Sequence, residues 1–123
     1  MKRDMELIRT ILLNVENDKY QYGQRVHVDG VSDQTCAYHV ALMVEEGLVV
    51  GNVLKTGSSP YAAAQIDRLT SEGHDFCEGI RQATIWNKVK KDVLKPGAAW
   101  TVKFVIQCVK KELYLHLGVP PTD

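Results

Sequence analysis

The chain of 123 residues lacks a surplus of charge of either sign, because 15 Lys and Arg side chains balance 15 Asp and Glu side chains. Proteins that mainly bind nucleic acid usually carry excess basic charge, since phosphate contacts supply much of the affinity. The composition therefore gives no general indication of nucleic-acid binding. With 45% hydrophobic and 24% charged residues, it is typical of one ordinary globular domain, which we expect to span residues 1–123.

Long apolar segments are also lacking. No stretch approaches the roughly 20 apolar residues that a membrane-spanning helix needs. The first residues, Met1-Lys2-Arg3-Asp4, lead directly into a charged amphipathic segment without the apolar core of a signal peptide. Three cysteines at wide, irregular spacing favour free thiols in a reducing compartment. We therefore expect a cytoplasmic protein with no membrane partner.

Motifs of catalysis are lacking as well. The sequence has no Gly-rich phosphate loop, no nucleophile elbow and no zinc-protease motif. Asp75 and Glu78 form one carboxylate pair at a spacing of three, with no second pair to complete a divalent-metal site. His39 and His74 have no evident nucleophile partner. We therefore predict a protein that is not an enzyme, with no cofactor and no small-molecule substrate.

The first half of the chain alternates between helical and extended patterns. Apolar residues at spacings of three and four predict a helix over residues 2–16. Tyr22 to Val28 is typical of a short strand. Ser32 is a good N-cap for a helix that runs to Glu46, and Gly47 suits the left-handed position that ends helices.

A hairpin follows that helix and determines the predicted fold. Leu48–Leu54 and Tyr61–Leu69 have the composition of two strands, joined by a loop over residues 55–60. A helix that ends in Glu-Glu-Gly-Leu-Val-Val and continues into a two-stranded wing, at about 48–69, is typical of a winged helix-turn-helix. We therefore predict a helix-rich α+β fold of the winged-helix class, with a core over residues 1–95.

Two additional helices are predicted after the wing. The first is capped by Thr70 and runs to about Lys95. The second covers residues 101–117, with Thr101 as its cap, and is closed by Gly118 and Pro120-Pro121. This last helix is apolar on more than one side, so it must be buried centrally or contact a partner.

Several motifs along nearly the whole chain match one family in order and spacing. They are Met1-Lys2-Arg3-Asp4-Met5-Glu6-Leu7-Ile8-Arg9, Tyr38-His39-Val40 with Leu42-Met43, Gly47-Leu48-Val49, Leu69-Thr70 with Glu72-Gly73-His74-Asp75-Phe76, Ile80-Arg81, and Trp86-Asn87-Lys88-Val89-Lys90. In these residues the chain resembles the YjcQ-like domain-of-unknown-function family of bacterial, prophage and phage proteins. The resemblance implies a winged-helix-like fold in a bacterial host cell and assigns no activity. The chain departs from the family pattern at Ser71, Cys36 and Cys77, which puts a shared surface function in doubt.

One constellation has the spacing of a metal site. Cys36-x-x-His39 and His74-x-x-Cys77 each place two ligands on one helical face, and together they could form a tetrahedral zinc site. The alternative interpretation is favoured: both cysteines fall among apolar residues and behave as small core side chains. We therefore predict no metal site.

DNA binding has candidates on the second helix and the wing. Gln34, Tyr38 and His39 could contact base edges, with Lys55 of the wing on the backbone. From Ser32 to Gly47, however, the chain has no Lys or Arg but three carboxylates, which disfavours phosphate contacts.

Basic residues gather further along the chain. Lys88, Lys91 and Lys95 would share one face of the predicted long helix, either as a patch for nucleic acid or an acidic protein, or as an ordinary solvated face. On the last helix a wide apolar surface could form a dimer interface or contact another protein. Its candidate residues are Phe104, Ile106, Leu113, Tyr114 and Leu117.

From these patterns we predict a non-enzymatic winged-helix binding module of phage or prophage type. Neutral total charge, an acidic second helix and an apolar last helix favour action by protein–protein contact, on a host or phage component or on a second copy. Regulation and counter-defence are the roles that this origin suggests. The alternative is a DNA-binding transcriptional regulator of winged-helix type.

Overall fold

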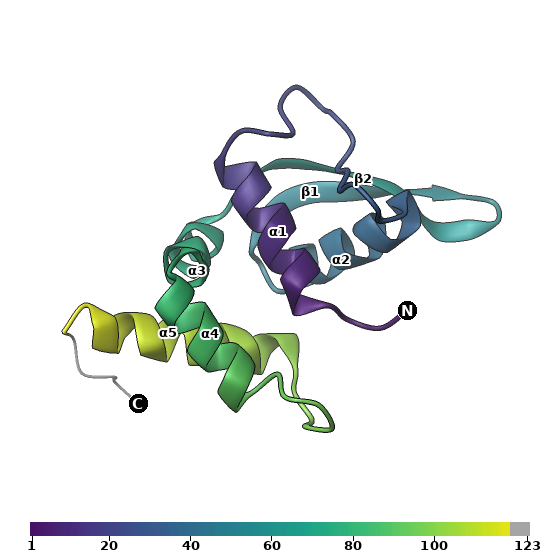
Figure 1. Ribbon diagram of the computed structural model, residues 1–123. Helices are drawn as coiled ribbons and strands as arrows, with labels where there is room; N and C mark the ends of the chain where they lie inside the picture. Colours follow the sequence, from purple (N-terminus) through teal and green to yellow (C-terminus); the bar gives the residue numbers. More distant parts are fainter. Residues whose placement is uncertain (119–123) are drawn as a thin grey trace. The chain divides into compact units, whose positions relative to one another are not determined.

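The structure is a computed structural model that describes residues 1–118. Its elements, in chain order, are α1 (Met5–Glu16), α2 (Asp33–Glu45), β1 (Val49–Thr56), β2 (Ser59–Leu69), α3 (Ser71–Arg81), α4 (Ala83–Asp92) and α5 (Val102–His116) (Figure 1). Over these residues the fold is helix-rich α+β, with five helices and one two-stranded antiparallel sheet. The predicted class is confirmed at that level. The predicted ending at Pro120-Pro121 lies outside the described residues.

The chain divides into two compact units, with the boundary inside α3. The N-terminal unit is Met1–His74, and the C-terminal unit begins at Asp75. None of the helices within residues 1–118 is long and apolar enough to cross a membrane. The prediction of a single domain over residues 1–123 stays a prediction.

Side-chain caps determine where α1 and α2 begin. The Asp4 carboxylate accepts a hydrogen bond from the Leu7 N–H at 3.2 Å, and the Ser32 hydroxyl accepts one from the Thr35 N–H at 3.1 Å. Each cap satisfies a backbone donor that the first helical turn leaves unpaired. Gly47 has a φ of +71°, the left-handed conformation that ends α2. The predicted limits of the second helix are confirmed.

β1 and β2 form the predicted hairpin, which in Figure 1 projects past the helices of its unit. The pairing runs from Val49 opposite Leu69 to Thr56 opposite Ser59, with irregular register at two points. β2 has a second neighbour, because Arg25 forms an isolated antiparallel bridge with Gln65.

The predicted strand at Tyr22–Val28 is wrong apart from that one bridge. Tyr22 and Gly23 have φ values of +58° and +74°, which are incompatible with a strand. The chain turns there and then runs beside β2 only at Arg25 and Val26, where the Val26 N–H donates to the Ala64 carbonyl at 2.8 Å.

The core of the N-terminal unit lies among α1, α2 and the hairpin. α2 contacts both strands, and α1 contacts α2 and β2. On α1 and α2 the fully buried side chains recur at spacings of three and four residues, as the sequence predicts, and Leu48 adds to them between α2 and β1. They include Ile8, Ile11, Leu12, Val40, Met43 and Leu48.

The long helix predicted to run from Thr70 to about Lys95 is wrong, because it is broken at Gln82. Gln82 has φ −77° and ψ 111°, an extended conformation, so α3 ends at Arg81 and α4 begins at Ala83. The apolar pattern gives the reason. Ile80 and Ile85 are five residues apart, so one straight helix would point them about 140° apart. The break allows both side chains to be buried.

In the C-terminal unit α4 contacts α5. The predicted cap of α5 is confirmed, since the Thr101 hydroxyl accepts a hydrogen bond from the Phe104 N–H at 3.0 Å. The buried face of α5 is regular, with a side chain every three or four residues: Val102, Val105, Val109 and Leu113. Gly79 of α3 lies against Val109, where a Cβ atom would clash.

Candidate functional site

The three α2 residues proposed to contact bases differ in their exposure. Gln34 is exposed on the first turn. Tyr38 is half-buried, with edge-to-face contacts to the rings of His39 and Tyr61 at centroid distances of 5.3 and 5.4 Å. His39 is only 1% exposed. Of the three, Gln34 alone has a side chain placed freely at the surface.

The His39 ring has a structural role that occupies both nitrogens. Its Nε2 accepts a hydrogen bond from the Asp4 backbone N–H at 2.9 Å. Its Nδ1 lies 2.8 Å from the Thr35 carbonyl, to which it can only donate. The two bonds define the neutral Nδ1–H tautomer and join the start of α1 to α2. His39 therefore has no lone pair left for a metal ion and no N–H left for a base edge.

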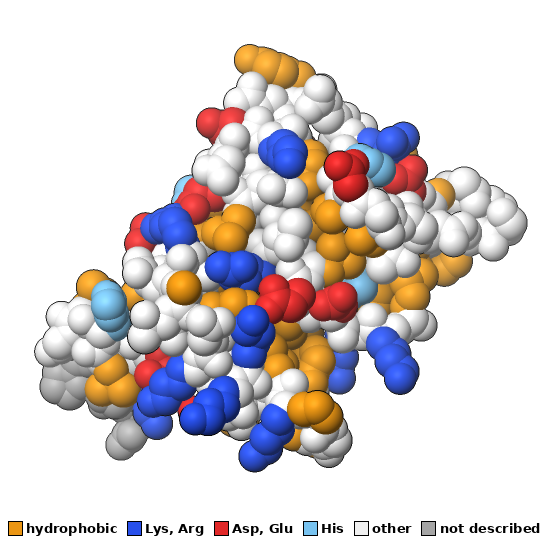
Figure 2. All heavy atoms as spheres, viewed as in Figure 1, with side chains coloured by type: hydrophobic (Ala, Val, Ile, Leu, Met, Phe, Trp, Pro, Cys, Tyr) orange, Lys and Arg blue, Asp and Glu red, His pale blue; other side chains and the backbone are white. Residues whose placement is uncertain are grey.

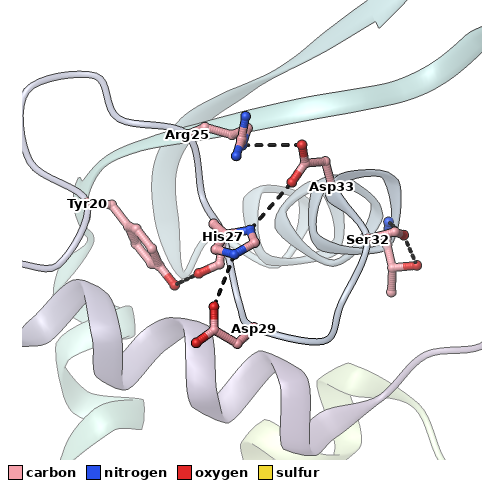
Figure 3. A network of polar contacts seen from close by, with 7 residues as sticks. Tyr20, Arg25, His27, Asp29, Ser32 and Asp33 are labelled. Atoms are coloured by element: carbon pink, nitrogen blue, oxygen red, sulfur yellow. Dashed lines mark hydrogen bonds and ion pairs between the residues drawn. The ribbon is translucent and has the colours of Figure 1, made fainter.

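A polar network ties the segment before α2 to the first turn of that helix (Figure 3). Arg25 Nε lies 3.3 Å from an Asp33 carboxylate oxygen, and His27 Nδ1 lies 3.7 Å from the other. His27 Nε2 is 3.2 Å from Asp29, and the Tyr20 hydroxyl donates to the His27 carbonyl at 2.8 Å. Sequence analysis missed this network, because none of its residues belongs to a motif. The network pairs the Asp33 carboxylate with the Arg25 guanidinium. The end of α2 remains acidic, because Glu45 and Glu46 lie there.

Tyr20 is the inner part of this network. Its hydroxyl also accepts a hydrogen bond from the Asn14 side-chain amide at 2.9 Å, and the residue is 8% exposed. Burial raises the pKa of the Tyr20 phenol above its usual value, although the Asn14 bond lowers it. The neutral hydroxyl donates one hydrogen bond and accepts another, and in this way holds the loop against α1.

The hairpin, which was predicted to act as a wing, offers little positive charge. Lys55 is exposed near the tip, where Thr56 and Ser59 pair around the turn. It is the single basic side chain between Val49 and Asp67. The hairpin could therefore make one phosphate contact through a side-chain cation, that of Lys55.

The four residues of the hypothetical zinc site are not assembled as a ligand set. Cys36 and Cys77 are fully buried, and burial raises the pKa of the Cys36 thiol, which disfavours the thiolate that binds zinc. His74 is exposed, and His39 is occupied as described. Within residues 1–118 no group of three or more His, Cys, Asp or Glu side chains could hold a metal ion.

His74 does line a pocket of the N-terminal unit, with a volume of about 200 Å³. Its wall is made of Val15, Glu16, Asp18, Tyr20, Gln21, Ile66, Asp67, Arg68, Leu69 and His74. This wall contains no Ser, Thr or Cys that could act as a nucleophile beside His74, and the Tyr20 hydroxyl is already engaged. The wall therefore offers no Ser, Thr or Cys nucleophile beside His74.

The three lysines predicted to share a helical face do not do so. Lys88 and Lys91 lie on α4, and the Lys88 ammonium is 3.2 Å from the Glu112 carboxylate of α5. Lys95 lies beyond the end of α4 at Asp92. The prediction of a common face for Lys88, Lys91 and Lys95 is therefore wrong, although Lys91 and Lys95 are exposed.

Positive charge nevertheless distinguishes the C-terminal unit. From Asp75 onward the chain has eight Lys and Arg against five Asp and Glu, a net charge of +3. Residues 1–74 have seven against ten, a net charge of −3. Figure 2 shows basic side chains gathered over α4 and α5.

The candidate partner residues of α5 do not form one surface. Leu113 is 8% exposed and belongs to the buried face of the helix. Phe104 and Leu117 are 49% and 63% exposed, but Phe104 points about 160° from Ile106 and about 140° from Leu117 around the helix axis. Tyr114 is half-buried, with the Lys110 ammonium 5.7 Å from its ring centroid.

A different set of α5 residues does form a continuous stripe. Phe104, Cys108, Lys111 and Leu115 follow one another at spacings of four, three and four, which is the spacing of a helix–helix seam. Leu115 is 47% exposed, Lys111 is exposed and Cys108 is half-buried. We call these four residues the α5 stripe. This spacing is present in the sequence. It cannot be recognised there, because α5 has apolar residues on several faces and the sequence does not show which face is buried.

Comparison with known proteins gives a family and no assigned activity. A family model described as "Hypothetical protein (DUF2513)" matches residues 2–99. An "Uncharacterized protein" of Haemophilus influenzae is 30% identical over 95 residues, which is 76% of this chain and 79% of the relative. No solved structure matches the chain. The predicted match to a family of unknown function is confirmed, whereas the particular YjcQ-like family and its phage setting stay predictions.

Proposed function

The chain belongs to the DUF2513 family, and we propose that it is a non-enzymatic binding module of winged-helix type that acts by protein–protein contact through the α5 stripe. The observation that carries this proposal is the half exposure of Phe104 and Leu115 on one face of α5, with Lys111 between them. The family match ends at residue 99, so this surface lies beyond the matched region.

The order of elements in the N-terminal unit supports the winged-helix part of the proposal. One helix, a segment that bridges β2, a second helix and a hairpin follow one another, and β2 lies between the bridging Arg25 and β1. A winged helix uses such a hairpin as its wing and the preceding helix as its recognition helix.

The chemistry of the α5 stripe indicates an amphipathic helix as the partner. A spacing of four, three and four fits the side-chain seam between two packed helices. Lys111 would be costly opposite an apolar or basic side chain, but a carboxylate opposite it satisfies the ammonium. The net charge of +3 on the C-terminal unit also favours an acidic partner. We therefore expect a partner helix with apolar residues at seam spacing and Asp or Glu facing Lys111.

The surroundings of α2 disfavour DNA as the main partner. The helix has no Lys or Arg, its end carries Glu45 and Glu46, and His39 is buried with both nitrogens occupied. Phosphate contacts supply much of the affinity of protein–DNA complexes, and carboxylates oppose them.

The resemblance to phage and prophage proteins supports a host or phage component of a bacterial cell as the partner. A small cytoplasmic module without catalysis would act there by occupying a surface that another protein needs. Regulation and counter-defence are two outcomes of such occupation.

Affinity capture from bacterial extract, with quantitative mass spectrometry, tests the proposal. We expect the double variant Phe104→Lys with Leu115→Lys to lose a protein that the unmodified chain retains. Leu117→Lys is the control, since it introduces the same residue at a more exposed apolar position, the C-cap of α5, outside the stripe. Lys111→Glu should also lose the protein, whereas Lys103→Glu should not. Equal recovery with all variants would contradict the proposal.

The second candidate is a DNA-binding transcriptional regulator, which the basic C-terminal unit favours. On this hypothesis Gln34 contacts a base edge and the lysines contact phosphates. Replacing Lys88, Lys91 and Lys95 with Glu would then cause a large, salt-dependent loss of DNA affinity. On the protein-contact proposal the same triple variant has no DNA affinity to lose.

A further inference from the structure

The hairpin has one strand with an open edge. β2 is bordered by β1 on one side and by the Arg25 bridge on the other, where the Gln65 side chain also donates to the Gly23 carbonyl at 2.8 Å. β1 pairs with β2 alone. Among residues 1–118, no backbone hydrogen bond joins Gly51–Leu54 to anything outside this hairpin. The outer edge of β1 is therefore free to accept another strand.

This edge is regular and partly apolar. Between Val49 and Leu54 no β1 residue is skipped in the pairing, so its side chains alternate strictly between two faces. Val49 is buried on one face, whereas Val50 and Leu54 are 38% and 47% exposed on the other, with exposed Asn52 between them. The six residues extend over roughly 20 Å.

The usual protection of an edge strand is missing here. Exposed edges in natural proteins carry Pro, charged side chains or bulges that block pairing with a further strand. Val49–Leu54 contains no Pro and no charged residue, and the first charge, Lys55, follows only at the end. The extra residue at the irregularity near Val50 is Asp67, on β2 and not on β1.

We propose that β1 pairs with β1 of a second copy of the chain, antiparallel and centred on Asn52, so that two hairpins form one four-stranded sheet. With Asn52 on the two-fold axis, Val50 lies opposite the partner's Leu54 on the same face. Such apolar cross-strand pairs stabilise a sheet, and the symmetry gives two of them. The register places Lys55 opposite the partner's Val49, so the two lysines never face each other.

This pairing is independent of the proposed partner of the α5 stripe, because it uses a different unit and a different class of contact. If affinity capture found no partner for the α5 stripe, the proposed β1–β1 pairing would not be affected. The proposed register has one specific consequence: the two copies of Asn52 lie opposite each other. No other residue of β1 faces its own copy in this register.

Disulfide crosslinking tests the register. In an antiparallel pair the two Cα atoms at position 52 would be about 4.5–5.5 Å apart, within the range that a disulfide spans. We expect Asn52→Cys, made with Cys108→Ser, to form a covalent dimer under mild oxidation. Lys55→Cys in the same background is the control, because its two copies would be about 20 Å apart. Equal crosslinking of both variants, or none of Asn52→Cys, would overturn the proposal.

Sedimentation equilibrium tests the association without new cysteines. We expect the chain to be a dimer at high concentration and Leu54→Lys to make it a monomer, because the exposed site tolerates the change but the pairing does not. Leu117→Lys, an equally drastic change on α5, should leave the dimer intact. A monomer at every concentration, or a dimer that survives Leu54→Lys but not Leu117→Lys, would show that β1 is not the interface.

Discussion

The two units of the chain differ in charge and in how their parts are joined. The N-terminal unit has a net charge of −3 and is held by contacts between distant segments: the hairpin, the Arg25 bridge and the His39 bonds between α1 and α2. The C-terminal unit has a net charge of +3 and is helical, with α4 and α5 joined by apolar side chains and by the Lys88–Glu112 ion pair.

This difference bears directly on function. A DNA-binding winged helix needs its recognition helix, its wing and its basic charge to act on one duplex. Here α2 and the hairpin belong to the unit with a net charge of −3, and the net positive charge belongs to the other unit. This division of charge is one reason for proposing contact with a protein over contact with a phosphate backbone.

The largest expected effect concerns glycines of α3 on either side of the unit boundary. A Cβ atom on Gly73 would clash with the Leu48 backbone carbonyl, whereas one on Gly79 would clash with a methyl group of Val109. A side chain can move more easily than a backbone, and the gain in helix propensity from alanine is the same at both sites. We expect Gly73→Ala to lower the free energy of unfolding by about 3 kcal/mol and Gly79→Ala by about half as much.

Chemical denaturation followed by circular dichroism measures both changes. Gly57→Ala is the control, because a Cβ at Gly57 meets nothing within 4 Å and should change stability by less than about 0.5 kcal/mol. If Gly73→Ala were as harmless as Gly57→Ala, α3 would not approach the Leu48 backbone as closely as the structure shows.

A smaller effect is expected at His39, which tests whether the acidic unit relies on buried polar bonds. His39→Ala leaves the Asp4 N–H and the Thr35 carbonyl without their partners, so we expect a loss of about 2 kcal/mol. His27→Ala removes only a half-exposed ring whose polar contacts are screened by solvent, and should cost less than about 1 kcal/mol. Equal losses in urea denaturation would contradict the structural role given to His39.

The smallest effect is a loss of stability at alkaline pH. Burial raises the pKa of the Cys36 thiol above its ordinary value of 9.0, so the folded chain keeps this proton to a higher pH than the unfolded chain. The stability that the protonated Cys36 thiol contributes is fully present below the pKa of the unfolded chain, and it is lost as pH rises through the pKa of the folded chain. We expect the free energy of unfolding to fall as pH rises above the ordinary pKa of 9.0, and to fall less in Cys36→Ala. Val40→Ala, which opens a similar cavity, should keep the slope of the unmodified chain.

Much of the fold could be predicted from the sequence because local signals and tertiary packing agree there. Ser32, Gly47 and Thr101 occupy the cap and stop positions that their chemistry favours, and the hairpin has its predicted strands. Prediction failed where a local pattern was ambiguous. The segment at Tyr22–Val28 has strand composition, but the left-handed backbone at Tyr22 and Gly23 prevents a strand there, and Gly23 was its one sequence signal.

The surfaces were harder to predict than the fold. The spacing of apolar residues predicts a helix, but it does not show which apolar side chains of that helix stay exposed after folding. Leu113 was expected among the partner residues but is buried, whereas Leu115 belongs to the α5 stripe. The end of α4 at Asp92 likewise keeps Lys95 off the face that Lys88 and Lys91 share. Only the spacing of five from Ile80 to Ile85 indicates the break at Gln82.

Fluorescence anisotropy of a labelled random-sequence DNA duplex, titrated with the purified chain at about 50 mM and then about 200 mM salt, tests the central claim most directly. We predict no saturable binding in the micromolar range at either salt, because α2 and the hairpin, which a winged helix would place on DNA, lie in the acidic unit. Micromolar binding at the lower salt that collapses at the higher would contradict the account and show that the lysines of the C-terminal unit contact phosphates.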